Sequence, residues 1–312
     1  MTKLKKASLT ASVLAASLMA SSGASALAFD QNVTPALIFG DGNDNGAFTV
    51  DSNGNIEVGL RAKLRHDASG SPENIFNSNG DGTYTFNPGI APGQSFPTAE
   101  WSFEWSVNTS LPADTGGNQG GDSGTPAFTT TLNAYTYLLE LDSNPAVGAA
   151  DFFVSFDPIM GPRLLGDGSG NTVNQWDHAI GNNSTGNGDG SKVTNGSADE
   201  TAYANLINSN NVAQNSWKPH WFINQPWADL SQSTTGAPAG TVSFDPSVSG
   251  EYEIRLSVLS GQDALTSTSI LVQVGELDTP PSGDVPVPGT LALFGLGLIG
   301  TGVGRRRLRR GA

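Results

Sequence analysis

Apolar and polar residues alternate one by one along several stretches of the chain. The longest stretch is 56–65, where Ile, Val, Leu, Ala and Leu occupy the even positions and Glu, Gly, Arg, Lys and Arg the odd ones. Successive side chains of a β-strand point to opposite faces, whereas a helix would scatter these apolar positions around its circumference. The pattern therefore predicts a strand that is half buried.

Further segments show the same alternation and are predicted to be strands. They are residues 101–107, 135–141, 152–156, 252–258 and 266–274. The loop at 260–263 joins the last two into a hairpin. Shorter strand candidates are residues 36–39, 47–50, 83–86 and 241–244.

Only residues 199–208 have a helical pattern. Many short strands separated by Gly, Asn and Pro are typical of a mainly β fold, and we predict an antiparallel β-sandwich of the jelly-roll or lectin-like kind. Two long polar segments, 112–126 and 166–196, predict surface loops or disordered segments that add nothing to the core. We assign one β-sandwich domain to residues 29–278 and a short linker to residues 279–284.

The first 28 residues have the features of a secretory signal peptide. Three lysines precede a mildly apolar run at 7–20, and a small-x-small site follows at Ala26-Leu27-Ala28. We predict export through the translocon and cleavage by signal peptidase after Ala28, with Ala24-Ser25-Ala26 as the alternative site.

The last residues form a three-part membrane stop. Val285-Pro286-Val287-Pro288 precedes an apolar run at 289–303, and a basic cluster of Arg305, Arg306, Arg307, Arg309 and Arg310 follows. A comfortable membrane span needs ~20 apolar residues, and each interior glycine weakens a helix by about 1 kcal/mol in water. This run is shorter and contains four glycines, so it predicts a short transmembrane helix suited to transient anchoring. The arginines would hold its end in the cytoplasm; a permanent tail anchor is the alternative.

This tail, residues 285–312, resembles the PEP-CTERM sorting signal, which exosortases recognise and cleave. Pro286-Val287-Pro288 stands where the family usually has Pro-Glu-Pro. The resemblance implies transient anchoring in the inner membrane, processing by an exosortase-type sorting enzyme, and delivery to the cell surface or the extracellular space. The implied processing residues are Val285, Pro286, Val287, Pro288 and Gly289, with Arg305, Arg306 and Arg307.

Net charge narrows the possible partners. All 29 acidic residues lie between the two terminal segments, where only seven of the 15 basic residues remain, so this region carries a charge of −22. Such an acidic body disfavours nucleic acid and anionic lipid headgroups, and it favours solubility and divalent cations. Cysteine is absent, so the exported domain has no disulfide.

Residues 41–46, Asp-Gly-Asn-Asp-Asn-Gly, match the front half of a calcium-loop pattern. Oxygen ligands at alternate positions can wrap a hard cation, which makes Asp41, Asn43, Asn45 and the nearby Asp51 candidate calcium ligands. Ser52 occupies the twelfth position, where an EF-hand has glutamate, so an EF-hand is excluded. A tight Asx-type turn between two strands is the alternative.

No catalytic constellation is recognisable in the sequence. The Gly-Asp-Ser-Gly stretch around Ser123 resembles a protease nucleophile loop, but the upstream His66 lies too close in sequence for that fold. The three histidines, His66, His178 and His220, are isolated and lack the spacing of zinc ligands. We therefore predict that the protein is not an enzyme.

Tryptophans form two groups with different expected roles. Trp101 and Trp105 share one strand face and are predicted to lie in the core. The less regular set Trp217, Trp221 and Trp227 is a candidate carbohydrate-binding surface.

Two functions follow from these features. The preferred one is an exported, non-enzymatic protein of the cell surface or extracellular matrix, associated with exopolysaccharide. The alternative is a calcium-assisted carbohydrate-binding or carbohydrate-active β-sandwich.

Overall fold

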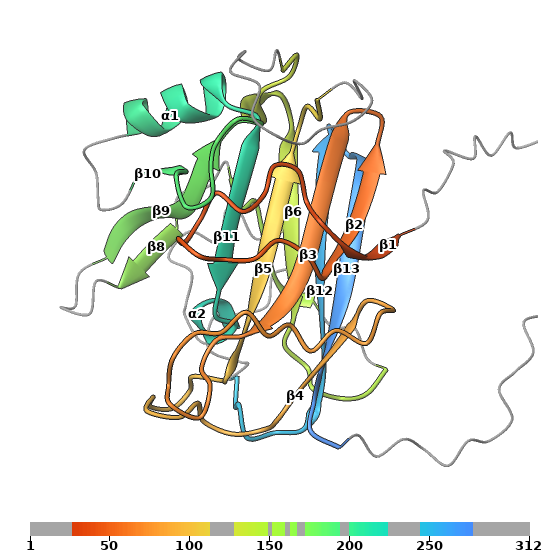
Figure 1. Cartoon of the computed structure of the whole chain (residues 1–312), viewed down its shortest axis with the longest axis vertical. Helices are drawn as coiled ribbons and strands as arrows, with labels where there is room; N and C mark the ends of the chain where they lie inside the picture. The colour runs from red at the N-terminus through yellow and green to blue at the C-terminus, as the bar shows by residue number, and fades with distance from the viewer. Residues whose placement is uncertain are drawn as a thin grey trace, which may run out of the picture. The chain divides into compact units, whose positions relative to one another are not determined.

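The computed structural model describes residues 27–112, 128–148, 152–159, 163–166, 172–193, 200–223 and 244–276 (Figure 1). The chain divides into two compact units, Met1–Gly275 and Glu276–Ala312. Among the described residues, no helix is long and apolar enough to cross a membrane. The predicted signal peptide up to Ala26, the linker and the sorting tail lie outside the described residues.

Two sheets built almost entirely from antiparallel pairs make up the first unit, which confirms the predicted fold class. The first sheet has the order β1-β2-β3-β5-β11-β9-β10, with β8 also paired to β9. Its strands are β1 (Ala28–Gln31), β2 (Phe48–Asn53), β3 (Ile56–Leu64), β5 (Trp101–Asn108), β8 (Arg163–Gly166), β9 (Thr172–Gly181), β10 (Ser191–Val193) and β11 (Val212–Trp217).

The second sheet has the order β4-β13-β12-β6-β7. Its strands are β4 (Thr83–Phe86), β6 (Thr136–Asp142), β7 (Phe152–Phe156), β12 (Gly250–Ser260) and β13 (Asp263–Val274). Only the β4–β13 pair is parallel. In the described part of the chain, three short helices accompany the sheets: α1 (Glu200–Ser209), α2 (His220–Ile223) and the 3-10 turn η1 (Leu132–Ala134).

The main core lies between the sheets and uses the alternating positions that the sequence predicts. Trp101 and Trp105 are both buried there, as expected. Trp101 lies 6.2 Å from Phe86 and 5.9 Å from Tyr252 between ring centroids, so it joins strands of both sheets. Burying a large apolar side chain stabilises a fold by roughly 1.5–3 kcal/mol, and the facing rows of β5, β12 and β13 supply many such side chains.

The first sheet is also covered on its outer face. Residues 32–47, which we call the covering segment, run from β1 across β3, β5 and β11 before the chain returns into β2 (Figure 1). Its apolar side chains Val33, Leu37, Ile38 and Phe39 form a second core cluster with side chains of β2, β9 and β11, namely Phe48, Val50, Ala179 and Val212. The Ile38 amide donates to Gln214 Oε1 at 2.8 Å, which fastens the segment to β11.

The covering segment corrects two predictions. Strand β3 is buried on both faces, so the expectation of a half-buried strand is wrong. Residues 36–39 were a strand candidate but belong to the covering segment and form no strand. Both differences have one cause: the covering segment lies over the polar face of the sheet. Alternation within one strand cannot reveal such a cover.

The predicted loop at 166–196 also needs correction. It contains β9 and β10, and His178, Ala179 and Ile180 of β9 are buried. The sequence of β9 is polar like that of a loop, yet His178 of this strand is buried and its Nε2 lies 2.8 Å from the hydroxyl of Tyr203. The other strand predictions are confirmed within a few residues, as is the helix α1, except that residues 241–243 lie outside the described part.

Candidate functional site

A buried ionic cluster lies under the covering segment. Arg61 and Lys63 are two residues apart on β3 and therefore share its outer face. On the neighbouring strand, Glu104 is the direct cross-strand partner of Arg61. Arg61 Nε donates to Glu104 Oε2 at 2.6 Å, and Lys63 Nζ lies 3.8 Å from Glu104 Oε1. All three side chains are at most 2% exposed.

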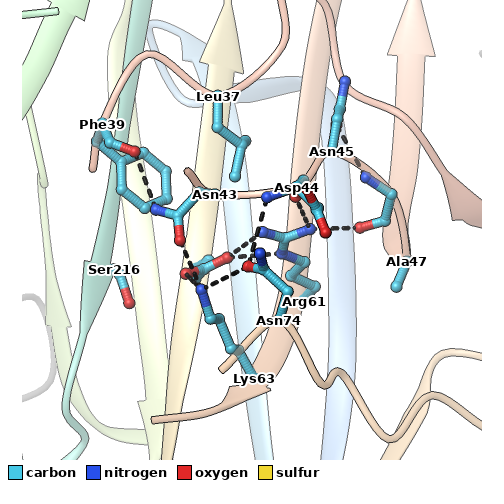
Figure 2. Close-up of polar contacts among 12 residues, drawn as sticks. Leu37, Phe39, Asn43, Asp44, Asn45, Ala47, Arg61, Lys63, Asn74 and Ser216 are labelled. Carbon is cyan, nitrogen blue, oxygen red and sulfur yellow. Dashed lines mark hydrogen bonds and ion pairs between the residues drawn. The ribbon is translucent and has the colours of Figure 1, made fainter. Parts of the chain in front are cut away.

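Oxygens of the covering segment and of Asn74, in the chain after β3, complete the cluster, as Figure 2 shows. Arg61 Nη1 donates to the backbone carbonyls of Asp44 (2.9 Å) and Gly46 (2.6 Å). Lys63 Nζ donates to the side-chain oxygens of Asn43 (2.5 Å) and Asn74 (3.1 Å). The protein thus replaces the water that these cations would otherwise bind.

Aromatic rings enclose the guanidinium of Arg61. Its central carbon lies 4.3 Å from the ring centroid of Phe48 and 4.1 Å from that of Phe76. Cations are attracted to aromatic faces most strongly where water is excluded. Burial lowers the pKa of Arg61 and of Lys63, and the charge of Glu104 opposes this effect in both. The arrangement can hold the covering segment on the sheet.

The candidate calcium ligands serve other contacts in the structure. The Asn43 oxygen accepts from Lys63, and the Asn45 oxygen accepts from the amides of Val33 and Gly46. Asp51 Oδ2 accepts from Thr266 Oγ1 at 2.6 Å, on β13 of the second sheet. Asp41 is exposed. Among the described residues, no group of three His, Cys, Asp or Glu could hold a metal ion, so the calcium site stays a prediction.

The candidate carbohydrate surface is not formed as predicted. Trp217 is fully buried, with its ring 5.0 Å from that of Trp105, so it has no face on which a sugar could stack. This is a correction, because β11 turns out to be an inner strand whose Trp217 side chain fills the core. Trp221 of α2 is partly buried, and Trp227 lies outside the described residues.

The histidines occupy different environments. His178 Nε2 lies 2.8 Å from the hydroxyl of Tyr203, and its ring is 5.6 Å from Trp105. His66 Nδ1 lies 3.2 Å from the carbonyl oxygen of Gly70. His220 lies beside Trp221 on α2. Ser123 of the protease-like stretch lies outside the described residues.

The sequence analysis missed the ionic cluster, although two signals for it were present. Arg61 and Lys63 fall on one face of a predicted strand, and Glu104 falls on the polar face of another. Opposite charges on neighbouring strands can pair across the sheet. What the sequence lacks is the register of the two strands and the segment that buries the pair.

Comparison with known proteins identifies a sorting motif in the C-terminal tail. Residues 284–310 match the family model of the PEP-CTERM protein-sorting motif. Searches of the curated proteins and of the solved structures found no match. The motif marks the chain as an exported protein sorted through an exosortase-type enzyme. The chain thus carries, as its sequence predicts, the C-terminal tail of a PEP-CTERM sorting-signal protein.

Proposed function

We propose that the protein is a non-catalytic component of the cell surface or of an exopolysaccharide-containing extracellular matrix. The observation that carries this proposal is the sorting motif at 284–310, placed after a compact β unit that ends at Gly275. In such an arrangement the tail determines the destination, and the β unit is what is delivered. Signal peptidase and the export translocon act first, and the exosortase-type enzyme follows.

The contacts of the buried charged groups support a structural role. Glu104 neutralises Arg61 within the first sheet. Asp51 joins β2 to β13 of the second sheet, and Glu57 accepts from the Thr34 amide of the covering segment at 2.7 Å. Catalytic carboxylates usually project into an accessible cleft, whereas these three are each at most 8% exposed and hold elements together.

The composition of the exported region supports a location outside the cytoplasm. A charge of −22 between the terminal segments keeps the body soluble and keeps it from nucleic acid and anionic membrane surfaces. The absence of cysteine makes folding independent of the redox state of the compartment. A matrix protein with this body would depend on packing and on buried polar contacts for stability.

Mass spectrometry of the mature C-terminus, combined with cell fractionation, tests the proposal. In an exosortase-bearing host we expect the protein at the surface or in the medium, with its chain ending near Pro288. Recovery of an intact tail through Arg310 from extracellular material would contradict processing. Recovery of the protein only from the cytoplasm would contradict the proposal as a whole.

Carbohydrate binding is a second candidate, favoured by one observation. Trp221 remains partly exposed beside Lys218, whose Nζ lies 5.8 Å from its ring centroid. A glycan array probed with the purified protein separates the two functions. Saturable binding of one sugar, with quenching of tryptophan fluorescence, would favour the second.

A further inference from the structure

Strand topology brings basic residues together where two inner strands of the first sheet end. Strands β3 and β11 both pair antiparallel with β5, so they run in the same direction and end on the same side. Arg65 and His66 follow β3, while Lys218 and His220 follow β11. Residues more than 150 positions apart in the sequence therefore meet beyond the first residue of β5.

The strand pairing places these residues near one another, and the ring contacts of Trp221 with Lys218 and His220 connect three of them. The electrostatic effects agree with this placement. Burial lowers the pKa of His66, and the charges of Lys218 and Arg65 lower it further. Burial and Lys218 together lower the pKa of His220 to about 4. Arg65 in turn adds to the effect of burial in lowering the pKa of Lys218. We call Arg65, His66, Lys218, His220 and Trp221 the strand-end cluster.

Positive charge of this kind is scarce in the exported region. Only seven basic residues lie between the terminal segments. Two of them, Arg61 and Lys63, are buried and bonded to Glu104, to oxygens of the covering segment and to Asn74. Neither Arg65 nor Lys218 forms an ion pair with a carboxylate in the part of the chain that the structure describes. In a protein so rich in carboxylates, two neighbouring cations without such a partner form a local site for an anion.

Nearby carboxylates are directed to other contacts. Glu100 Oε1 accepts from the amide of Asn87. The carboxylate of Asp67 accepts from Ser69 and from the amide of Ser71 within its own loop. Among the described residues, neither of these carboxylates forms an ion pair with Arg65 or Lys218.

Two imidazole nitrogens of the cluster also lack partners. His66 Nε2 and His220 Nδ1 are buried and form no hydrogen bond within the described structure. His66 as a whole is only 7% exposed. Buried polar groups in folded proteins nearly always find a partner, and an exception calls for an explanation such as a bound ion or ligand. His66 Nδ1 faces the Gly70 carbonyl oxygen, so the unpartnered Nε2 can donate only when the ring is protonated. Protonated imidazoles that donate to a bound anion would satisfy these nitrogens.

We propose that the strand-end cluster binds the carboxylate of an acidic sugar, namely a uronic acid residue of a glycan. Arg65 and Lys218 supply the positive charge, and His66 and His220, protonated when the ligand binds, donate to the carboxylate oxygens. Trp221 is partly exposed, with Lys218 Nζ 5.8 Å from its ring centroid, and contributes an aromatic surface for the sugar ring. The assignment deepens the second candidate function, carbohydrate binding, and it rests on the proposed surface location for access to an extracellular glycan.

The charge of the whole body restricts the kind of glycan. Exposed charges are largely screened beyond about 8 Å at physiological ionic strength, so a single carboxylate experiences the local cations more than the distant carboxylates. A densely charged polyanion would approach many acidic residues at once and be repelled. We therefore expect isolated uronic acid residues in a mainly neutral polymer to be the ligand.

Binding should be linked to proton uptake. With pKa values lowered by burial and by Arg65 and Lys218, both imidazoles are neutral at pH 7 in the free protein. A bound carboxylate favours the imidazolium form and raises these pKa values. Affinity for the uronic acid should therefore increase as the pH falls from about 7.5 to about 5.5.

Isothermal titration calorimetry on the full-length chain in detergent micelles tests the site. The probes are galacturonic acid, neutral galactose and inorganic phosphate, in two buffers of different ionisation enthalpy so that proton uptake is measured. We expect saturable heat with galacturonic acid, none with galactose, and net proton uptake. Lys218→Gln and Arg65→Gln should each weaken binding by about tenfold or more, as for other charge-assisted contacts.

Lys192→Gln is the matched control, because Lys192 of β10 is exposed and its loss changes the net charge equally. It should leave binding within about twofold, the usual scale for a distant exposed charge. Equal weakening by Lys192→Gln would overturn the site in favour of a general charge effect. Equal affinity for phosphate and galacturonic acid would overturn the sugar assignment, and absence of heat would overturn the site itself. The mature C-terminus reports sorting and calorimetry reports binding, so the two proposals can fail separately.

Discussion

Glu104 is fully buried between Arg61 and Lys63 and is the only carboxylate paired with them in the described part of the structure. A buried ion pair is weak evidence for net stabilisation, because desolvation opposes the attraction between the charges. Removing one partner is different, since it leaves the other charge buried without compensation. Two cations depend here on one anion, so the cluster is especially sensitive to the loss of Glu104.

Replacing Glu104 by Gln should therefore destabilise the protein by about 3–5 kcal/mol, the range for breaking a buried pair. Urea denaturation measures the change in the free energy of unfolding. Glu140→Gln is the control. Glu140 pairs with Arg255, whose side chain is 39% exposed, so this ion pair lies at the surface. Such surface pairs contribute about 0–1 kcal/mol. Similar losses for the two variants would show that the cluster is not neutralised as described.

Glu57 carries a second prediction at the residue scale. Burial raises the pKa of this carboxyl from 4.5 to about 7, despite the hydrogen bond from the Thr34 amide. Between these values the folded state binds more protons than the unfolded state, so Glu57 makes stability fall as the pH rises through that window. Its contribution is unfavourable above about pH 7 and vanishes below about pH 4.5.

We expect Glu57→Gln to be more stable than the natural protein at about pH 8 by roughly 1–3 kcal/mol. The difference should shrink as the pH approaches 4.5. Chemical denaturation at several pH values measures it, and Glu73→Gln provides a control at an exposed carboxyl. A stability difference that did not change with pH would show that Glu57 titrates normally in the folded protein.

At the scale of elements, β3 shows how far a sequence pattern reaches. Its alternation predicts the strand and its inner face, and the structure confirms both. The same alternation suggests an outer face in water, which is wrong because the covering segment lies there. Close packing explains Gly59 in the middle of the strand: a Cβ at this position would lie 2.6 Å from Val33 Cγ1 and 3.2 Å from Phe48 Cδ1.

Gly59→Ala should accordingly destabilise the protein by about 1–3 kcal/mol, as overpacking does in other cores. A double-mutant cycle with Val33→Ala tests the cause. Because the second substitution removes the closest clashing atom, we expect the double variant to lose less stability than the sum of the single variants, by about 0.5–3 kcal/mol. Strict additivity would argue against contact between β3 and the covering segment at this point.

Strands β9 and β11 could not be predicted from local patterns. Gln214 of β11 bonds to Ile38 and Ser106, and Asn211, just before β11, bonds to Asn108 on β5. These polar side chains are buried because partners from distant segments satisfy them. A sequence window around either strand contains polar residues where a core strand would normally show apolar ones, and so it resembles a loop.

For the whole molecule, the two terminal segments and the acidic body have separate tasks. The tail matches a sorting motif, and its arginines are expected to stop transfer at the cytoplasmic face. The body between them carries the acidic charge and the two sheets. Sorting should therefore respond to the tail and remain insensitive to substitutions in the body that preserve folding.

Replacing Arg305, Arg306, Arg307, Arg309 and Arg310 by glutamine should impair membrane retention before processing, because the electrostatic stop is lost. Pulse-chase labelling with fractionation measures retention and C-terminal processing. Lysine at the same five positions keeps the charge and should restore both. Unchanged processing of the glutamine variant would contradict the mechanism, as would identical sorting of a reporter with and without the tail.

The sequence by itself determined the β class, most of the strands, the single helix of ten residues and the sorting tail, because these depend on local periodicity and on linear order. Only the tertiary structure decided which polar residues are buried, that Trp217 belongs to the core, and that Arg65 and Lys218 follow strands that end on the same side of the first sheet. Those outcomes depend on strand register, on the covering segment and on the common direction of β3 and β11. Such relations join residues far apart in the chain, so no local pattern encodes them.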